Sequence, residues 1–406
     1  MSSWPGGIPG ARWPEAPAMR IVDVNGFYAE AGGGVRRYVD AKFAAAGRAG
    51  HDLTVIAPGA QTRAEPRPGG RVAWIESPLM PLDARYRRFA GAPAVWAAMD
   101  AAAPDLVEAS SPWGSATIAA GWSGRSARAL AFHQDVVAVY GHTTLDRLIS
   151  RQAIDTLAWP WWARLRRLAT RFDITVAGGD WLTARLAAHG VANAVSVPLG
   201  IEAGRFGATQ RDEALHAQLL AKCAVAPAGK LLVAVSRFHP EKRLPTVIEA
   251  FARARRVRPD LGLIVIGDGL ARRSVEHAAK RAGGVALLGA VTDRGDLARI
   301  LASADLFVHG SGAETYGLAA AEAVASAVTI VVPDSGGAAD LAARGLSKTY
   351  RAGDAADCAR AILAVLAGEA DPPTAPPPGS LDEHFTALFG LYERLPMIAG
   401  VSLGGR

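Results

Sequence analysis

The feature that most constrains the fold is a regular alternation of short apolar runs with longer segments of helical length. From Arg20 onward, runs rich in Val and Ile are followed by longer segments rich in Ala, Leu and Arg. Strands that alternate with helical spacers predict parallel sheets covered by helices on both faces. The first series of runs is 20–25, 52–57, 71–76, 105–109, 129–133, 174–178 and 194–198, and the second is 230–237, 261–269, 285–290, 305–310 and 328–334.

Two such series predict an α/β protein with two Rossmann-like domains that face each other across a cleft. The 406 residues are too many for one ordinary domain and are sufficient for two. The stretch PLGIEAGRFGATQRDEA between the series has no clear period, so we interpret it as a linker. We therefore place the first domain at 19–203 and the second at 204–380.

The two ends of the chain differ from these series. Residues 1–18 contain Pro, Gly and two Trp but no continuous apolar stretch, so we expect a flexible leader rather than a signal peptide. After the proline-rich stretch 371–380, apolar residues recur at helical spacing over 381–395. We expect residues 381–406 to form a helix and tail that cross back to the first domain.

Composition narrows the class of partner. Half of the residues are hydrophobic and 20% are charged, which argues against disorder. The net charge of +6 and the pI of about 9.5 suit an anionic partner, namely nucleic acid, a phosphorylated small molecule or an anionic membrane face. The two cysteines, Cys223 and Cys358, suit a reducing cytoplasm, and no apolar run reaches the roughly 18 to 20 residues that span a bilayer.

Ligands of parallel α/β sheets bind beyond the carboxyl ends of the strands, so functional residues should follow the strands. After the first strand, AGGGVRRYV places Gly33 and Gly34 where a backbone can approach a ligand and a helix start can face an anion. The chain has no GxxxxGK[ST] run, which argues against a P-loop NTPase, and Arg37 breaks the GxGxxG fingerprint. The alternative is a glycine-rich turn of no special chemistry.

The second domain opens with a sharper signal. Arg237 ends the strand LLVAVSR, and Lys242 follows within RFHPEKR. A planar guanidinium and a mobile ammonium just past a strand end predict a clamp for a diphosphate, which they could neutralise without a metal. The alternative is a solvated cluster of Arg237, Lys242 and Arg243.

The stretch SGAETYGLAAAEA places two glutamates on either side of a helix start. The N–H groups of Gly317 and Leu318 would face a phosphate, while Glu314 and Glu322 could accept hydrogen bonds from sugar and ribose hydroxyls. Their separation of at most about 12 Å is the scale of a nucleotide sugar. Two alternatives remain, an acid/base pair as in a glycoside hydrolase and a pair of glutamates favoured by the helix dipole.

These residues resemble the retaining glycosyltransferases of family 4, which have the two-domain GT-B fold. The resemblance rests on SRFHPEKR, IGDG, LGAVTDRGDLARILASADLFVHGS, the stretch from Glu314 to Glu322, and DSGG, in that order and at matching spacing. In the first domain it rests on GGV at 33–35, the strand that ends at His133, and FDITVAGGDWL. The resemblance implies transfer of a sugar from a nucleotide-diphosphate donor with retention, giving an α-linked product.

The resemblance also assigns roles in the second domain. It implies that Arg237 and Lys242 hold the diphosphate, that Glu314 bonds the donor sugar, and that Glu322 bonds the ribose. The base is expected to pack against the turn at Gly289–Val291, which makes Val291 a binding residue. Such enzymes often work without a bound metal, so we expect no cofactor besides the nucleotide-sugar co-substrate.

In the first domain, the resemblance implies that Gly33 and Gly34 approach the donor and that His133 reaches the donor sugar. On its own, His133 would more often be an ordinary histidine at a strand end. No carboxylate is evidently placed as a nucleophile. We therefore expect the incoming hydroxyl to attack on the leaving-group face while the phosphate oxygen takes its proton, with electrostatic stabilisation of the departing diphosphate supplying much of the catalysis.

Three positions depart from the family pattern. The family usually has Gly and Pro where this chain has Ala327 and Thr329, and Glu where it has Asp340. The first two shape the turn into the last strand of the series. The departures therefore concern local geometry, since both glutamates and the helix start at Gly317 are kept.

The acceptor is expected to be a saccharide or a lipid-linked molecule. The segment 157–172 mixes three tryptophans with four arginines, which suits a lipid headgroup layer, and YRRF at 86–89 adds positive charge. The alternative is an ordinary helix with buried tryptophans and solvated arginines. We therefore expect a cytoplasmic enzyme, with a hypothesis of peripheral contact at the inner membrane face and no nucleic-acid partner.

A weak preference for GDP-mannose as the donor comes from a general likeness to lipid mannosyltransferases. Two other functions stay open from the sequence. The first is a sugar-nucleotide epimerase on the same fold, and the second is a nucleotide-sugar-binding protein without turnover.

Overall fold

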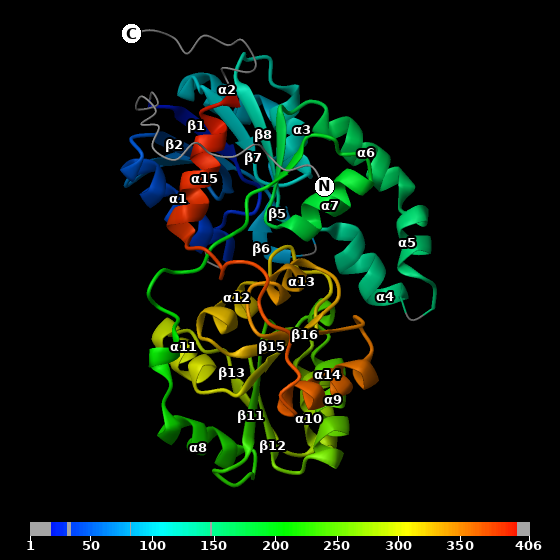
Figure 1. The fold of residues 1–406 in the computed structure, drawn as a ribbon. Coiled ribbons are helices and arrows are strands. Elements are labelled where there is room, and N and C mark those ends of the chain that lie inside the picture. The colour runs from blue at the N-terminus through cyan, green and yellow to red at the C-terminus, as the bar shows by residue number, and fades with distance from the viewer. Residues whose placement is uncertain (1–17, 31–33, 82, 147, 396–406) are drawn as a thin grey trace. The chain divides into compact units, whose positions relative to one another are not determined.

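The computed structural model describes residues 18–30, 34–81, 83–146 and 148–395, and its elements follow the predicted alternation (Figure 1). By its contacts, the chain divides into two compact units. The first comprises 1–109, 114–129 and 388–406, and the second comprises 110–113 and 130–387. The domain boundary placed between 203 and 204 stays a prediction.

The first unit is built on a mainly parallel sheet. Its strands lie in the order β7-β1-β2-β4-β3, with β1 parallel to both β2 and β7 and β3 antiparallel to β4. The strands are β1 (Arg20–Val24), β2 (Asp52–Gly59), β3 (Arg63–Arg67), β4 (Gly70–Glu76), β7 (Leu106–Ala109) and the hairpin β5 (Leu79–Met80) with β6 (Asp83–Arg87). The helices are α1 (Gly34–Arg48), α2 (Ala92–Ala102) and α3 (Gly114–Gly121). The sequence did not indicate β3, β5 or β6, because none of them forms an apolar run.

The C-terminal helix α15 (Leu381–Tyr392) ends in the first unit. The Tyr392 hydroxyl donates to Glu108 Oε2 on β7 at 2.7 Å. Lys42 Nζ of α1 lies 2.6 Å from the same Glu108 oxygen and 3.1 Å from Asp23 Oδ2 of β1, with all these side chains buried. A buried lysine is tolerated here because two carboxylates compensate its charge. The C-terminal helix thus ends beside β7 in the first unit. That 381–406 form one crossover segment stays a prediction, because the tail 396–406 lies outside the described residues, as does the predicted leader up to residue 17.

The second unit begins with three strands in the order β10-β9-β8. They are β8 (Ala127–Phe132), which the unit includes from Leu130, β9 (Ile174–Ala177) and β10 (Ala194–Ser196). Between β8 and β9 lies a run of short helices, and α7 follows β9. These elements are the π-helix η1 (Val137–His142), α4 (Thr143–Leu145), α5 (Arg151–Leu157), α6 (Trp159–Ala169) and α7 (Asp180–Ala188).

A six-stranded, fully parallel sheet follows in the same unit, in the order β13-β12-β11-β14-β15-β16. Its strands are β11 (Lys230–Val235), β12 (Leu261–Ile266), β13 (Val285–Gly289), β14 (Leu306–Val308), β15 (Thr329–Pro333) and β16 (Ser347–Tyr350). Its helices are η2 (Ala208–Gln210), α8 (Glu213–Lys222), η3 (Pro240–Lys242), α9 (Leu244–Val257), α10 (Arg272–Ala282), α11 (Arg294–Ala302), α12 (Leu318–Ala325), α13 (Gly337–Ala342) and α14 (Ala355–Leu366). The sequence missed β16, whose SKTY has no apolar run.

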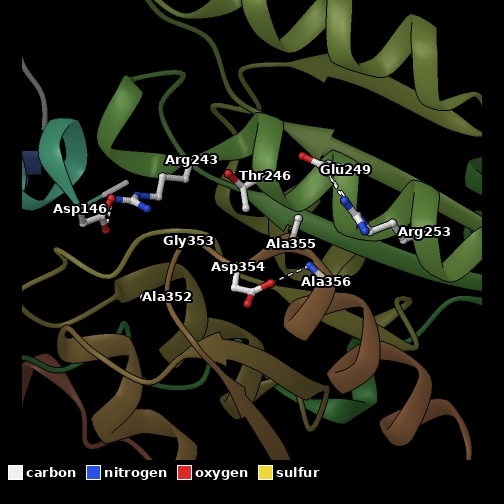
Figure 2. A pocket seen from close by; sticks show the side chains of 10 residues that line it. All are labelled: Asp146, Arg243, Thr246, Glu249, Arg253, Ala352, Gly353, Asp354, Ala355 and Ala356. Atoms are coloured by element: carbon white, nitrogen blue, oxygen red, sulfur yellow. Dashed lines mark hydrogen bonds and ion pairs between the residues drawn. The ribbon is translucent and has the colours of Figure 1, made fainter. Parts of the chain in front are cut away.

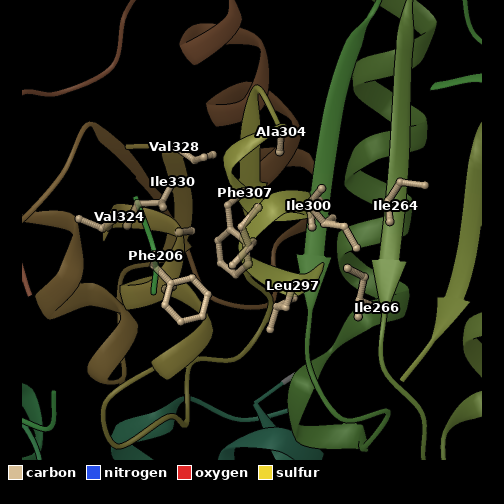
Figure 3. Packing of buried hydrophobic residues seen from close by; sticks show 14 of the residues in the cluster. Phe206, Ile264, Ile266, Leu297, Ile300, Ala304, Phe307, Val324, Val328 and Ile330 are labelled. Atoms are coloured by element: carbon tan, nitrogen blue, oxygen red, sulfur yellow. The ribbon is translucent and has the colours of Figure 1, made fainter. Parts of the chain in front are cut away.

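Both faces of this sheet are buried, as the predicted helix-covered parallel sheet requires. Successive residues of a strand point to opposite faces. Leu231 and Val233 of β11 therefore join one cluster with α11, α12 and α13, while Leu232 and Ala234 join another with α9, α10 and α14. Figure 3 shows part of the first cluster, in which Phe206 and Phe307 lie among aliphatic side chains. The fold class is confirmed as α/β with two Rossmann-like sheets.

Candidate active site

The order of the six strands defines where a ligand should bind. From β11 the chain proceeds outward through β12 and β13, then returns to place β14 on the other side of β11. The strand order thus reverses between β11 and β14, and open α/β sheets bind ligands beyond the strand ends at such a switch point. The loops after these two strands carry the predicted residues Lys242 and Glu314.

These two loops bring opposite charges into direct contact. Lys242 Nζ donates to Glu314 Oε1 at 2.7 Å. The Lys242 side chain is 12% exposed and the Glu314 side chain 21% exposed, so the pair is largely buried but still accessible to a ligand. His309, which follows β14, places Nε2 at 3.4 Å from the same glutamate oxygen. An acidic side chain and a basic one therefore meet at the predicted sheet edge.

The protonation of Glu314 is set by this contact. Burial by itself favours the neutral acid. The positive charge of Lys242 and the hydrogen bond with His309 outweigh burial, and they hold the pKa of Glu314 well below its usual range. Glu314 is therefore an anion at every physiological pH, which suits a hydrogen-bond acceptor and does not suit a general acid.

A second carboxylate, Glu241, organises the cations of the predicted clamp. It is buried in η3 and lies 3.4 Å from Lys242 Nζ, 3.6 Å from the Arg237 guanidinium and 3.0 Å from His239 Nδ1. Arg237 is 78% exposed, so its guanidinium remains accessible to an anion. Glu241 was not predicted from the sequence, although an acid flanked by cations in HPEKR was the signal available.

Close backbone approach fixes the spacing of the two loops. A Cβ added to Gly310 would lie 2.5 Å from the Lys242 carbonyl oxygen and 2.8 Å from Val247 Cγ2. Only a glycine therefore lets the end of β14 approach the Lys242 loop this closely. On the other side, the Gly337 N–H donates to the Glu314 carbonyl at 2.7 Å, which ties the DSGG turn to the same loop.

The predicted helix start follows Glu314 directly. Gly317 adopts φ of 92° and caps α12, and its carbonyl accepts from the N–H groups of Ala320 and Ala321. Leu318 is the first residue of the helix and is exposed. Its N–H therefore lies at the positive end of the helix dipole, the type of position that favours a phosphate.

Glu322 lies one turn further along α12 and is buried. Its carboxylate pairs with the guanidinium of Arg294, the first residue of α11. Arg294 also lies over the Phe206 ring at 5.0 Å and near Glu202 at 3.4 Å. Arg294 was not predicted from the sequence, because only the fold brings it to Glu322 from 28 positions away.

The other predicted residues are spread over both units. Val291 follows β13, is partly buried and packs against the core cluster that contains Phe206. His133 follows β8 in the second unit and is exposed. Gly34 begins α1 in the first unit, where a Cβ would meet nothing within 4 Å. Gly33 lies outside the described residues.

Two of the departures from the family pattern, Ala327 and Asp340, can be examined in the structure. Ala327 follows α12 with φ of 58°, a left-handed conformation that glycine adopts without strain. Asp340 of α13 accepts from the main-chain N–H of Trp181 at 2.9 Å, so it caps α7. A Cβ on Gly179 would lie 2.9 Å from this carboxylate. The shorter Asp340 is thus accommodated by a specific contact.

The predicted interfacial segment is only partly exposed. Of its three tryptophans, Trp159 is 67% exposed, Trp161 packs on Trp113 and is half-buried, and Trp162 is buried against His189. Leu157, the first residue of the segment, is also exposed. Further exposed apolar side chains lie upstream of it, namely Tyr140, Leu145, Leu148 and Ile149.

Among the described residues, no helix is both long and apolar enough to cross a membrane. Within the same residues, no group of three or more His, Cys, Asp or Glu side chains is arranged to hold a metal ion.

Comparison with known proteins identifies both halves of the chain. Residues 32–205 match the family described as Glycosyltransferase Family 4, and residues 221–375 match the one described as Glycosyl transferases group 1. A GDP-mannose-dependent alpha-mannosyltransferase of Mycobacterium tuberculosis is 31% identical over 303 residues, which cover 72% of this chain and 73% of that protein. A GDP-mannose-dependent alpha-(1-6)-phosphatidylinositol dimannoside mannosyltransferase of the same organism is 29% identical over 338 residues, which cover 79% and 84%.

Solved structures agree on the fold. Sucrose-phosphate synthase from Thermosynechococcus elongatus superimposes with a TM-score of 0.66 at 18% identity, covering 94% of this chain and 98% of that one. Trehalose 6-phosphate synthase from Burkholderia multivorans gives a TM-score of 0.66 at 15% identity, covering 96% and 100%. At these identities, the likeness concerns the fold alone.

Proposed function

We propose that this chain, which belongs to glycosyltransferase family 4, transfers mannose from GDP-mannose to a hydroxyl of a lipid-linked acceptor. Members of this family are retaining enzymes of the GT-B fold. The donor follows from the curated relatives, two of which are named as GDP-mannose-dependent. The acceptor class follows from the one named for a phosphatidylinositol dimannoside. The product would be an α-mannoside.

The observation that carries this proposal is the contact of Lys242 with Glu314 at the switch point of the sheet. A diphosphate needs cations, and the sugar attached to it needs an acceptor of hydroxyl hydrogen bonds. The two side chains supply both within one hydrogen bond of each other. Arg237 adds an exposed guanidinium to the cationic side through their shared partner Glu241.

In the proposed reaction, the bond from the anomeric carbon to the phosphate oxygen breaks while the acceptor oxygen bonds to the same carbon on the same face. The leaving diphosphate takes the bonding electron pair and accepts the acceptor's proton. Arg237 and Lys242 stabilise the charge that develops on it, and this electrostatic term supplies much of the catalysis. His133 and Glu314 would hold the sugar, and Glu322 together with Arg294 would face the ribose.

A metal is not required by this scheme, because the two cations would neutralise the diphosphate themselves. We expect turnover to persist when the purified enzyme is assayed in excess EDTA. A complete loss of turnover that Mg²⁺ or Mn²⁺ restores would contradict this part of the proposal.

The donor is tested first with a thermal-shift panel of GDP-mannose, UDP-glucose and other nucleotide sugars. The stabilising donor is then incubated with phosphatidylinositol-linked acceptors in detergent, and the products are examined by mass spectrometry and NMR. Release of GDP with an α-mannosylated lipid supports the proposal. An isomerised donor would indicate an epimerase, and binding without turnover would indicate a binding protein, so either result would contradict it.

A lipid acceptor requires contact with the bilayer, and the run of short helices α4 to α6 offers a surface for it. Leu148 is 79% exposed and Trp159 67% exposed, and Arg166 and Arg167 lie on the exposed face of α6. Apolar side chains beside arginines suit insertion among anionic headgroups. We propose the peripheral contact on this surface, which includes part of the segment 157–172 and extends upstream of it to Leu148.

Flotation with vesicles that contain phosphatidylglycerol tests this surface. The wild type should float at low salt, and the double variant Leu148→Ser with Trp159→Ser should remain at the bottom of the gradient. The matched control replaces Val257 and Leu270, which are 65% and 85% exposed elsewhere in the chain, with Ser. Equal flotation of both double variants would contradict the assignment. If the wild type self-associates as its concentration rises, and the variant Leu148→Ser with Trp159→Ser does not, the surface is a protein interface instead.

A further inference from the structure

Asp146, which none of the motifs includes, lies at the centre of a polar network behind the candidate active site. It follows α4 on the segment that starts at His133, and its side chain is 9% exposed. Its Oδ2 accepts from Arg243 at 2.7 Å and from Arg151 at 3.3 Å. One carboxylate oxygen thus holds two guanidinium groups, that of Arg151 from five positions along the same segment and that of Arg243 from 97 positions away.

The first of these guanidiniums controls the Lys242 loop. Arg243 is the residue after Lys242, and its side chain also donates to the His142 carbonyl at 2.9 Å. Its backbone is left-handed, with φ of 49°, which is unfavourable for a residue with a side chain and persists only where its surroundings hold it. The contact with Asp146 is one such restraint, because it fixes the side chain of this residue. Displacement of Arg243 would therefore displace Lys242.

The second guanidinium controls the Glu314 loop. Arg151 donates to the Ser335 hydroxyl at 2.7 Å, and that hydroxyl lies 3.3 Å from the Gly312 carbonyl oxygen, two residues before Glu314. Arg151 also donates to the Ala352 carbonyl at 3.3 Å. Asp146 is thus linked by short chains of hydrogen bonds to both sides of the Lys242–Glu314 contact.

We propose that Asp146 is a positioning residue of the donor site, which sets the distance between Lys242 and Glu314 by holding Arg243 and Arg151. It acts without touching the donor, and the inference rests on the proposed role of Lys242 and Glu314 in donor binding. Loss of its charge leaves two like-charged groups facing each other, so the two loops would separate. A misplacement of about 1 Å at a reacting centre can lower the rate by about 10²-fold.

An open cavity beside Asp146 makes the proposal testable by chemical rescue. Asp146 and Arg243 line a cavity of about 470 Å³ together with Glu249, Arg253 and Asp354 (Figure 2). A small carboxylate that diffuses into it would reach the Arg243 guanidinium. In the variant Asp146→Ala, added formate can therefore replace the missing negative charge. If the role of Asp146 were purely steric, formate would not restore function.

The experiment compares Asp146→Ala, Asp146→Asn and the control Glu249→Ala by titration with GDP and by steady-state kinetics. Glu249 lines the same cavity but pairs with Arg253 on its own helix. Both Asp146 variants should bind GDP about 10- to 100-fold more weakly and turn over more slowly, and the control should match the wild type. Formate should restore part of the affinity and turnover of Asp146→Ala and leave the wild type unchanged.

Wild-type GDP affinity in Asp146→Asn, or no effect of formate on Asp146→Ala, would overturn the proposal. If the Asp146 variants do not fold, Arg151→Gln tests the branch that reaches the Glu314 loop, and unchanged GDP affinity and turnover there would overturn it equally. If the wild type prefers another nucleoside diphosphate, the proposed donor is wrong, and the same comparison is made with the nucleotide that it binds.

Discussion

Substitution of Gly310 by Ala tests whether the site depends on the close approach of two loops. A Cβ at this position would lie 2.5 Å from the Lys242 carbonyl oxygen, 2.8 Å from Val247 Cγ2 and 3.2 Å from the Arg243 carbonyl oxygen. Gly310 has no left-handed backbone, so the effect of a methyl group is steric. To relax the shortest contact to about 3.4 Å, the lower end of ordinary van der Waals contact, the loops must separate by roughly 0.9 Å.

This displacement sets the expected magnitudes. Overpacking of this kind costs about 1–3 kcal/mol of folding free energy. A shift of this size in Lys242 relative to Glu314 should lower kcat/KM for the donor by up to about 10²-fold. The stability effect is measured by urea unfolding, and the functional effect by GDP titration and steady-state kinetics.

The matched control is Gly390→Ala in α15, where an added Cβ meets nothing within 4 Å. This control should keep wild-type kinetics and gain up to about 1 kcal/mol, because alanine is the better helix former. A folded Gly310→Ala protein with wild-type GDP affinity and turnover would refute the reasoning, since the spacing of the two loops would then not matter.

Three further predictions concern single residues. Lys242→Ala should weaken GDP binding by about 10- to 100-fold in a calorimetric titration, because a charge-assisted hydrogen bond is lost. The control Lys280→Ala, on the exposed face of α10, should bind GDP as the wild type does, and equal affinities of the two variants would contradict the clamp. Ala327→Gly should raise stability by about 0.5–1 kcal/mol in urea unfolding, since it relieves a left-handed alanine, whereas Ala325→Gly at the end of α12 should lower it. The pKa of Glu314 is depressed in the folded state, because Lys242 and His309 outweigh its burial, so its ionised form stabilises the fold above the ordinary value of 4.5. The difference in unfolding free energy between wild type and Glu314→Gln should therefore stay constant from pH 8 to about 5.5 and shrink as the pH falls below 4.5; a difference that already shrinks near pH 7 would contradict the depressed pKa.

The hydrophobic pattern was sufficient to predict the sheets, because strand and helix periods are local properties of the chain. Every predicted apolar run contains a strand, and the predicted helices beginning at Leu318 and within 381–395 are present. The pattern failed for β3 and β16, which lack apolar runs and pair with neighbours at a sheet edge. Their strand state comes from those neighbours and not from their own sequence.

The sequence by itself determined which side chains follow the strands, and hence that Lys242 and Glu314 would lie at the same edge of the sheet, since all strands of a parallel sheet end on the same side. It also showed where this chain departs from its family, at Ala327, Thr329 and Asp340. Only the tertiary structure decided which partners these groups take, because a side-chain contact depends on distances of a few tenths of an ångström between segments far apart in the chain. Glu314 with Lys242 and Asp146 with Arg243 are contacts across 72 and 97 positions, and no local pattern encodes them.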